Sequence, residues 1–271
     1  MKLDRLLAKH RGMGRKQARE LIAAGSVHVD GIMRDRHDVE VDRFHCVTTN
    51  DETVQAGQRR LFIMLHKPVG IVSATKDAEH QTVIDLIDDP DKETLHIVGR
   101  LDRNTSGLIL LTNDGNWSKP LTHPDHKVPK VYLVETDRPI PPEAVAAFAE
   151  GFHFHTEDLT TRPATLEILS ERKARLTLHE GRYHQVKRMF HRIGNRVVAL
   201  HRESIGPLRL PADLPPGGWR FLEFPEITAL GTMKPPISGT SIDRVLKFPA
   251  FPPLETAKNP EIGDFGLARP D

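Results

Sequence analysis

The sequence predicts an α+β protein, with a short helical segment at its N-terminus and a longer segment rich in strands. Leu3, Leu6 and Leu7 recur at helical spacing. Continuous apolar runs at 61–65 and 108–111 are short and bounded by turn residues, which is typical of buried strands. The 271 residues, 38% of them hydrophobic, suffice for one or two domains with a substantial core.

Composition excludes several classes of protein. No run of about 18 apolar residues occurs, and the N-terminus lacks the features of a secretion signal, so we expect a cytoplasmic protein without membrane contact. The single cysteine, Cys46, cannot form an internal disulfide and is predicted to be a small buried side chain. His179 and His184 are five residues apart instead of the four of HExxH, and no P-loop occurs. We therefore expect neither a metal nor a nucleotide cofactor.

Residues 1–58 form the first predicted domain. Two short helices are followed by a hairpin over 27–33, in which Asp30 and Gly31 supply the positive φ angles of a tight turn. Residues 1–19 hold seven basic residues against one acidic residue, a surplus that attracts phosphates. A basic helix pair is also compatible with an ordinary solvated surface, so charge alone leaves both interpretations open.

The second predicted domain covers 59–230. A polar, unpatterned linker is predicted at 51–60, a short helix at 82–87 and a longer helix at 184–193. From residue 231 onward, seven of 41 residues are Pro and the apolar residues lack any period, which predicts a disordered or loosely packed tail. Strands are predicted at 61–65, 96–98, 108–112, 131–135 and 175–178.

Asp102 is the candidate catalytic carboxylate. It lies in a cluster of turn formers directly before the predicted strand at 108–112. An acid so placed is fixed by the strand behind it while it faces a cleft, although an Asp that merely hydrogen-bonds its own turn fits the local pattern too. Asp114 lies at the far end of the strand, too distant for the paired carboxylates of a glycosidase.

Four stretches of the sequence identify a family. The string at 99–115, GRLDRNTSGLILLTNDG, resembles the active-site motif of pseudouridine synthases. Residues 130–132 (KVY) are similar to the K-x-Y element of that family, and residues 180–189 (EGRYHQVKRM) to its third motif. Residues 66–70 (HKPVG) resemble its first motif, with His66 where Asn is more usual. The HQVKRM string makes the resemblance closest to the branch that modifies ribosomal RNA, and within it to the small-subunit enzymes.

The resemblance implies a fold and a catalytic set. The fold is a mixed, mainly antiparallel sheet, and Asp102 is the single catalytic carboxylate, which either attacks or deprotonates the nucleoside. Tyr132 stacks on the uracil, which must leave the RNA stack to react; an aromatic residue on a strand is otherwise ordinarily part of the core. Lys187 pairs with Asp102 and keeps it ionised, as an opposite charge within about 4–6 Å does. No metal or cofactor takes part.

The resemblance also implies contacts with RNA. The N-terminal run resembles the α-L motif, a small RNA-binding module, so Arg15, Lys16 and Arg19 are predicted to contact RNA backbone. Arg100 suits a phosphate or the vacated base position, and an ion pair that steadies its loop is an equal alternative.

A second basic patch is predicted at 172–202, which holds nine basic residues against one acidic residue. Arg182 and Arg188 are its candidates for RNA binding. Target specificity is expected to come largely from this patch and from the N-terminal module, because RNA is recognised by shape, phosphates and splayed bases.

These observations predict the isomerisation of a specific uridine in small-subunit rRNA to pseudouridine. The partner is rRNA within an assembly intermediate, and the protein is expected to be a monomer. One alternative is a synthase that acts on a large-subunit uridine. Another is a ribosome-assembly factor without an essential catalytic role, against which the intact Asp102, Tyr132 and Lys187 argue.

Overall fold

A computed structural model describes residues 1–50, 52–155 and 157–230. The chain divides into two compact units, the first of which ends at Arg59 and the second of which begins at Arg60. The predicted tail from residue 231 lies outside the described residues. Within these ranges, none of the helices has the length and apolar character needed to cross a membrane.

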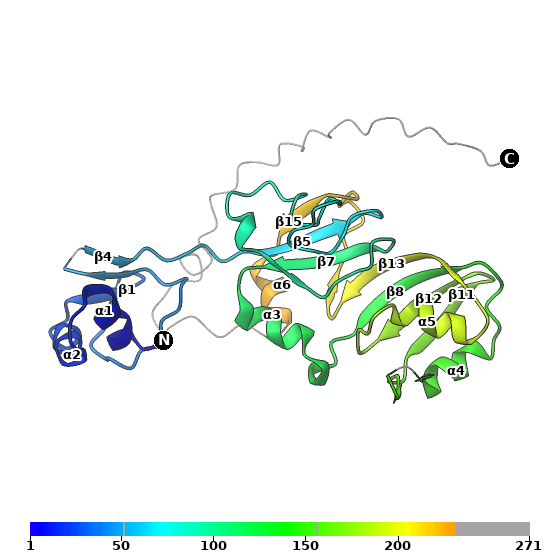
Figure 1. Ribbon diagram of the computed structural model, residues 1–271, viewed down its shortest axis with the longest axis horizontal. Coiled ribbons are helices and arrows are strands. Elements are labelled where there is room, and N and C mark those ends of the chain that lie inside the picture. Colours follow the sequence, from blue (N-terminus) through cyan, green and yellow to red (C-terminus); the bar gives the residue numbers. More distant parts are fainter. Residues whose placement is uncertain (51, 156, 231–271) are drawn as a thin grey trace. The chain divides into compact units, whose positions relative to one another are not determined.

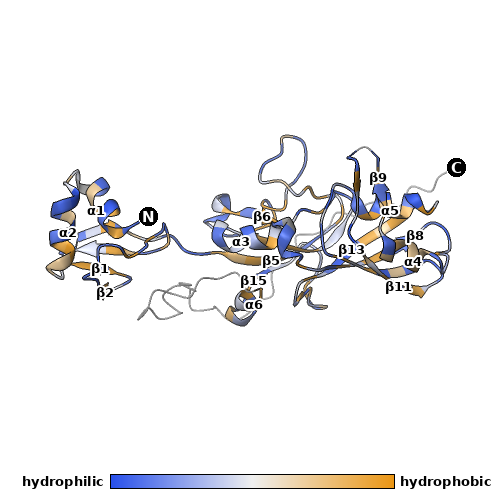
Figure 2. Ribbon diagram, turned by 90° about the horizontal axis from the view of Figure 1, so that it is seen from below, coloured by the Kyte–Doolittle hydropathy of each residue, from blue (hydrophilic) through white to orange (hydrophobic). Residues whose placement is uncertain are grey.

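The first unit packs two helices, α1 (Leu3–Arg11) and α2 (Arg15–Ala23), on a four-stranded antiparallel sheet. Leu3 and Leu7 are fully buried, as is Ile22 of α2, and Figure 2 shows both hydrophobic and hydrophilic segments along α2. This burial explains the helical spacing of the apolar residues. The strands, in spatial order, are β2 (Ile32–Met33), β1 (Val27–Val29), β3 (Val47–Thr49) and β4 (Glu52–Gln55).

The hairpin of β1 and β2 confirms the prediction, since Asp30 and Gly31 have φ angles of 54° and 78°. The predicted linker is wrong in part, because Glu52–Gln55 forms an edge strand. Val54 is the only apolar side chain that this strand adds to the core, so the segment shows no sequence alternation. Cys46 is half-buried rather than enclosed.

The second unit is built on a nine-stranded sheet (Figure 1). The main path runs β11-β12-β8-β13-β7-β5-β15, while β14 pairs with β13 and β6 with β7. Only β13 and β7 are parallel among the described pairs of this sheet, which confirms a mixed, mainly antiparallel arrangement. The strands are β5 (Phe62–Lys67), β6 (His96–Val98), β7 (Ser106–Thr112), β8 (Lys130–Thr136), β11 (Thr165–Ser170), β12 (Lys173–Leu178), β13 (Val197–Ile205), β14 (Leu208–Arg209) and β15 (Trp219–Phe221).

Short helices and a small hairpin surround this sheet. Helix α5 begins one residue after His184, close to the predicted position. The remaining elements are η1 (Lys92–Thr94), α3 (Gly115–Thr122), η2 (Pro124–His126), α4 (Ala144–Glu150), β9 (His153–Phe154), β10 (Leu159–Thr160), α5 (Gln185–Arg192) and α6 (Phe224–Ala229).

Strands β5 and β7 are buried on both faces, which explains their continuous apolar sequences. On one face, the ring of Phe62 contacts the ring of Trp117 in α3, with centroids 5.0 Å apart. The indole of Trp117 also donates to the carbonyl of Ile227 in α6. On the other face, Ile63 and Leu65 pack against residues 83–95. The sheet centre is therefore a rigid support for the loops at its ends.

Helices α4 and α5 cover the other half of the sheet, over β8, β11 and β12 (Figure 1). The two helices contact each other through the rings of Phe148 and Phe190, whose centroids are 4.9 Å apart. Val186 and Met189 complete the buried face of α5. The opposite face of this helix is left for polar side chains, because the apolar residues recur at helical spacing.

The helix predicted at 82–87 is wrong, because this segment forms a turn. The backbone N–H and the hydroxyl of Thr82 both donate to one carboxylate oxygen of Asp85. Such local side-chain bonds offer the backbone an alternative to helix. Val83, Ile84 and Ile87 are nevertheless buried against the sheet, so the apolar residues that suggested a helix serve the core instead.

Gly107 marks a close approach of two backbones. Its φ is +112°, and a Cβ atom there would overlap the backbone O and N of Arg202 on the parallel strand β13. Gly107→Ala should therefore lower the free energy of unfolding by about 2–3 kcal/mol, measured by denaturant titration. Gly115→Ala is the matched control, since no atom lies within 4 Å of that Cβ position. Equal stability of the two variants would contradict the expected strain.

Candidate active site

Asp102 lies in the loop between β6 and β7 and lines a cleft of about 780 Å³ in the second unit. The carboxylate is 28% exposed, so it is accessible from the cleft but partly shielded. Lys130 and Tyr132 reach the same cleft from β8, and Lys187 reaches it from α5. Residues distant in the sequence thus converge on one acid.

Two cationic or ionisable side chains contact Asp102. The Nζ atom of Lys187 is 3.4 Å from Oδ2, and Nε2 of His184 is 3.5 Å from Oδ1. The sequence predicts the Lys187 pair, whereas His184 is a residue that sequence reasoning missed. His184 has a left-handed φ of 49° immediately before α5, and its ring stacks on that of Tyr183 at 3.9 Å between centroids. Tyr183 is 77% exposed.

Tyr132 belongs to the core and also lines the cleft of Asp102. Its side chain is 7% exposed and belongs to the hydrophobic cluster beneath α4 and α5, as expected for an aromatic residue on a strand. The same residue lines the cleft of Asp102. Its neighbours across the sheet are Leu176 of β12 and Arg202 of β13. The ring is therefore held rigidly by the core while it reaches the cleft.

Lys67 supports one side of the Asp102 loop from beneath. Its side chain is fully buried, and Nζ donates to the carbonyls of Pro68 (3.0 Å), Arg103 (3.2 Å) and Thr105 (2.8 Å). Burial lowers the pKa of Lys67 to about 8, although the charge of Asp102 opposes this shift. From the sequence, this lysine is only the first residue of a turn. The sequence signal for its supporting role is its position, since it is a charged residue at the end of a continuous apolar strand.

Arg202 supports the other side of the loop. Its guanidinium donates through Nε to the carbonyl of Leu108 (2.7 Å) and through Nη2 to that of Gly99 (2.9 Å). The sequence includes Arg202 in the predicted basic patch, and this is wrong because the residue is only 1% exposed. Lys67 and Arg202 therefore fix the backbone on both sides of Asp102, a positioning function that the motifs do not reveal.

The predicted RNA contacts of the second unit have different environments. Arg100 is exposed and lines the cleft of Asp102. Arg182 lines it as well, and its Nε donates to Glu180 at 3.1 Å. Arg188 lies outside this cleft and donates to both carboxylate oxygens of Glu157. Only Arg100 and Arg182 thus lie beside the candidate active site.

In the first unit, Arg15 and Arg19 both contact the buried Asp4, at 3.2 and 2.9 Å. Burial by itself raises the pKa of the Asp4 carboxyl. The hydrogen bonds and charges of Arg19 and Arg15 together outweigh burial, so the pKa is lowered. About half of each arginine side chain stays exposed, at 52% and 47%. Lys16 is exposed beside them. The two arginines therefore join α1 to α2 and still present charge to solvent.

The described residues contain no group of three His, Cys, Asp or Glu side chains that could hold a metal ion. One carboxylate beside an ammonium group suits nucleophilic or general-base catalysis.

Comparisons with known proteins agree with the motifs. Residues 61–192 match the family described as RNA pseudouridylate synthase. Ribosomal small subunit pseudouridine synthase A of Pseudomonas aeruginosa is 52% identical over 232 residues, which cover 85% of this chain and all of that protein. The Escherichia coli K12 protein of the same name is 43% identical over 238 residues, with the same coverage. A crystal structure of a pseudouridylate synthase is 39% identical, with a TM-score of 0.62, over 85% of this chain and 99% of the other.

Proposed function

The chain belongs to the RNA pseudouridylate synthase family, and we propose from this premise that it isomerises one uridine of small-subunit rRNA to pseudouridine. The single observation that carries the proposal is the pairing of Asp102 with Lys187 in a cleft that Tyr132 also lines. The relatives named for small-subunit rRNA match this chain over their whole length, which favours that RNA as the substrate.

The proposed reaction breaks the bond between C1′ of ribose and N1 of uracil and rebuilds it at C5. Asp102 acts on the nucleoside either as a nucleophile or as a base, and both roles require the ionised carboxylate. The Nζ atom of Lys187, 3.4 Å from Oδ2, places a positive charge beside that carboxylate. The proton that leaves C5 is balanced by the proton that N1 gains, so the reaction needs no added oxidant or cofactor.

Tyr132 is proposed to stack on the flipped uracil. A base that reacts at its glycosidic bond must leave the RNA stack, and an aromatic face compensates for the lost stacking. The cleft, at about 780 Å³, lies within the usual range of roughly 300–1,000 Å³ for small-molecule sites. The proposed substrate pocket is therefore large enough for a nucleoside.

We further propose that Arg100 and Arg182 hold RNA at the cleft, and that Arg15, Lys16 and Arg19 hold it on the first unit. Exposed arginine donors suit phosphate oxygens. The protein is proposed to act in the cytoplasm, as a monomer on an assembly intermediate that contains the rRNA.

Chemical mapping of pseudouridine in both rRNAs tests the function. Cells that lack the protein should lose one small-subunit site, which wild-type protein restores and Asp102→Asn does not. Loss of a large-subunit site instead would retain the chemistry and reassign the target. If no site is lost, the proposed activity is wrong and a non-catalytic assembly role becomes the better explanation.

RNA binding should weaken as the pH rises through about 8. Lys130 lines the cleft. Its pKa is lowered to about 8, mainly by burial and to a smaller extent by the positive charge of Arg202. Its ammonium therefore attracts phosphate below this pH and loses its charge above it, so the Kd of RNA should rise roughly three- to tenfold between pH 7 and 9.5. Lys130→Arg stays charged and should remove most of this rise. An identical rise in both proteins would exclude Lys130 as its source.

A further inference from the structure

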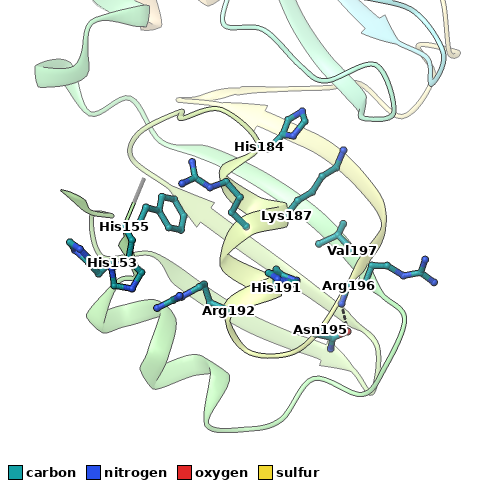
Figure 3. Close-up of a pocket in the computed structure, with 11 residues that line it drawn as sticks. His153, His155, His184, Lys187, His191, Arg192, Asn195, Arg196 and Val197 are labelled. Carbon is teal, nitrogen blue, oxygen red and sulfur yellow. Dashed lines mark hydrogen bonds between the residues drawn. The ribbon is translucent and has the colours of Figure 1, made fainter. Parts of the chain in front are cut away.

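A second cleft lies beside the candidate active site in the same unit. It has a volume of about 590 Å³ and lies along the exposed face of α5, between residues 153–155 and residues 195–197 (Figure 3). We call this cleft the α5 groove. His184 and Lys187 line both the α5 groove and the cleft of Asp102. The two clefts therefore adjoin at these side chains, and a chain that leaves one can enter the other.

Basic side chains line the α5 groove. Positions four apart on a helix lie on one face, so Lys187 and His191 are neighbours, as are Arg188 and Arg192. Arg196 adds a further positive charge just beyond the helix. Among the described residues that line the groove there is no carboxylate. This composition suits a polyanion.

The arginines differ in their existing partners. Glu157 accepts from Arg188 at 2.8 and 2.6 Å, which occupies the terminal nitrogens of that guanidinium. Arg196 is 3.3 Å from Asp137, but 75% of its side chain is exposed. Arg192 is exposed, and no acidic side chain in the described ranges pairs with it. Figure 3 shows it directed toward residues 153–155. Arg192 and Arg196 are therefore the cations best able to bind phosphate.

Arg188 offers a flat surface between these charges. Its guanidinium lies 3.7 Å from the centroid of the buried Phe154 ring, and the two bonds to Glu157 hold it there. Its outer side is partly accessible, since 26% of the side chain is exposed. Unpaired bases stack on arginine planes as they do on aromatic rings. Phosphate-binding cations beside a stacking surface are the two parts of a site for single-stranded nucleic acid.

We infer that the α5 groove binds the unpaired RNA directly next to the target uridine, with Arg192 and Arg196 on its phosphates and Arg188 against a base. The inference rests on the proposed function, since a uridine held at Asp102 brings the strand to the junction at His184 and Lys187. The groove lengthens the recognised RNA beyond the nucleoside and gives the enzyme a means to select the target from its neighbours.

The test is a binding cycle with the full chain. Three RNAs are compared. The first is a small-subunit rRNA fragment with the target uridine in its interior. In the other two, the target uridine is the 5′-terminal or the 3′-terminal nucleotide. For the wild-type protein, one truncation should raise Kd about tenfold. Arg192→Ala/Arg196→Ala should raise Kd about tenfold on the intact RNA and should be insensitive to that same truncation. Its slope of log K against log salt should fall by about 1.4, for two single-strand phosphates.

Arg209→Ala is the matched control, because this arginine is exposed in the same unit, lies outside the basic patch at 172–202 and lines neither cleft. It should bind all three RNAs as the wild-type protein does. The inference is wrong if the double variant binds the intact RNA like the wild type. It is also wrong if the substitutions raise Kd by the same factor on both truncated RNAs as on the intact RNA. Uridine conversion by the wild type is measured in the same samples. Absent conversion overturns the proposed function, whereas conversion with unchanged affinities overturns only the α5 groove.

Discussion

Asp102→Asn should lower kcat for pseudouridine formation by about 10⁴-fold or more, because the variant lacks the ionised carboxylate that both candidate mechanisms require. RNA affinity should stay near that of the wild type, since the amide keeps the size and position of the side chain. The free energy of unfolding should change little, because Asp102 is 28% exposed and its ion-pair partners His184 and Lys187 are themselves partly exposed. Single-turnover kinetics at saturating RNA separates this loss from a binding defect.

Asp77→Asn is a matched control for this substitution. Asp77 lines the same cleft and has a similarly exposed side chain, at 34%. Its Oδ1 accepts hydrogen bonds from the backbone N–H groups of Glu79 and His80, and an asparagine oxygen preserves them. Conversion should therefore continue at nearly the wild-type rate. Comparable losses in the two variants would indicate that cleft charge in general, and not Asp102 in particular, supports the reaction.

Arg202→Met should lower both stability and catalysis. The carbonyls of Gly99 and Leu108 would lose their donors in a buried setting, which should cost about 3 kcal/mol of unfolding free energy. The loop that carries Asp102 would also shift, and a displacement of about 1 Å can cost roughly 100-fold in rate. Denaturant titration and single-turnover kinetics measure the two effects.

The effect on kcat and KM distinguishes a positioning role of Arg202 from a purely structural one. Arg202 positions Asp102 through backbone carbonyls and is itself only 1% exposed, so kcat should fall about 100-fold while KM changes little. Arg202→Lys should restore part of kcat, because an ammonium can donate to one of the same carbonyls. Arg209→Met, at an exposed arginine on the neighbouring strand β14, should match the wild type. An unchanged kcat in the folded Arg202→Met protein would exclude the positioning role.

Much of the molecule could be predicted from local sequence. The short apolar runs of β5 and β7 predict strands because both faces of these strands are buried, and Asp30-Gly31 predicts a hairpin because the turn needs two positive φ angles. The motif around Asp102, together with those at 130–132 and 180–189, identifies the family. The segments at 52–55 and 82–87 could not be predicted correctly, because their structure depends on one buried valine and on a side-chain bond within a turn.

The sequence by itself therefore determined the family, the candidate acid and its ammonium partner, since these reside in short contiguous motifs. Only the tertiary structure decided which cations are accessible. Arg202 and Arg192 belong to the same basic segment, yet the pairing of β13 with β7 and β8 buries the first beneath the Asp102 loop, while α5 exposes the second. Charge counts do not contain this difference, because burial depends on strand register and on packing between residues about 100 positions apart.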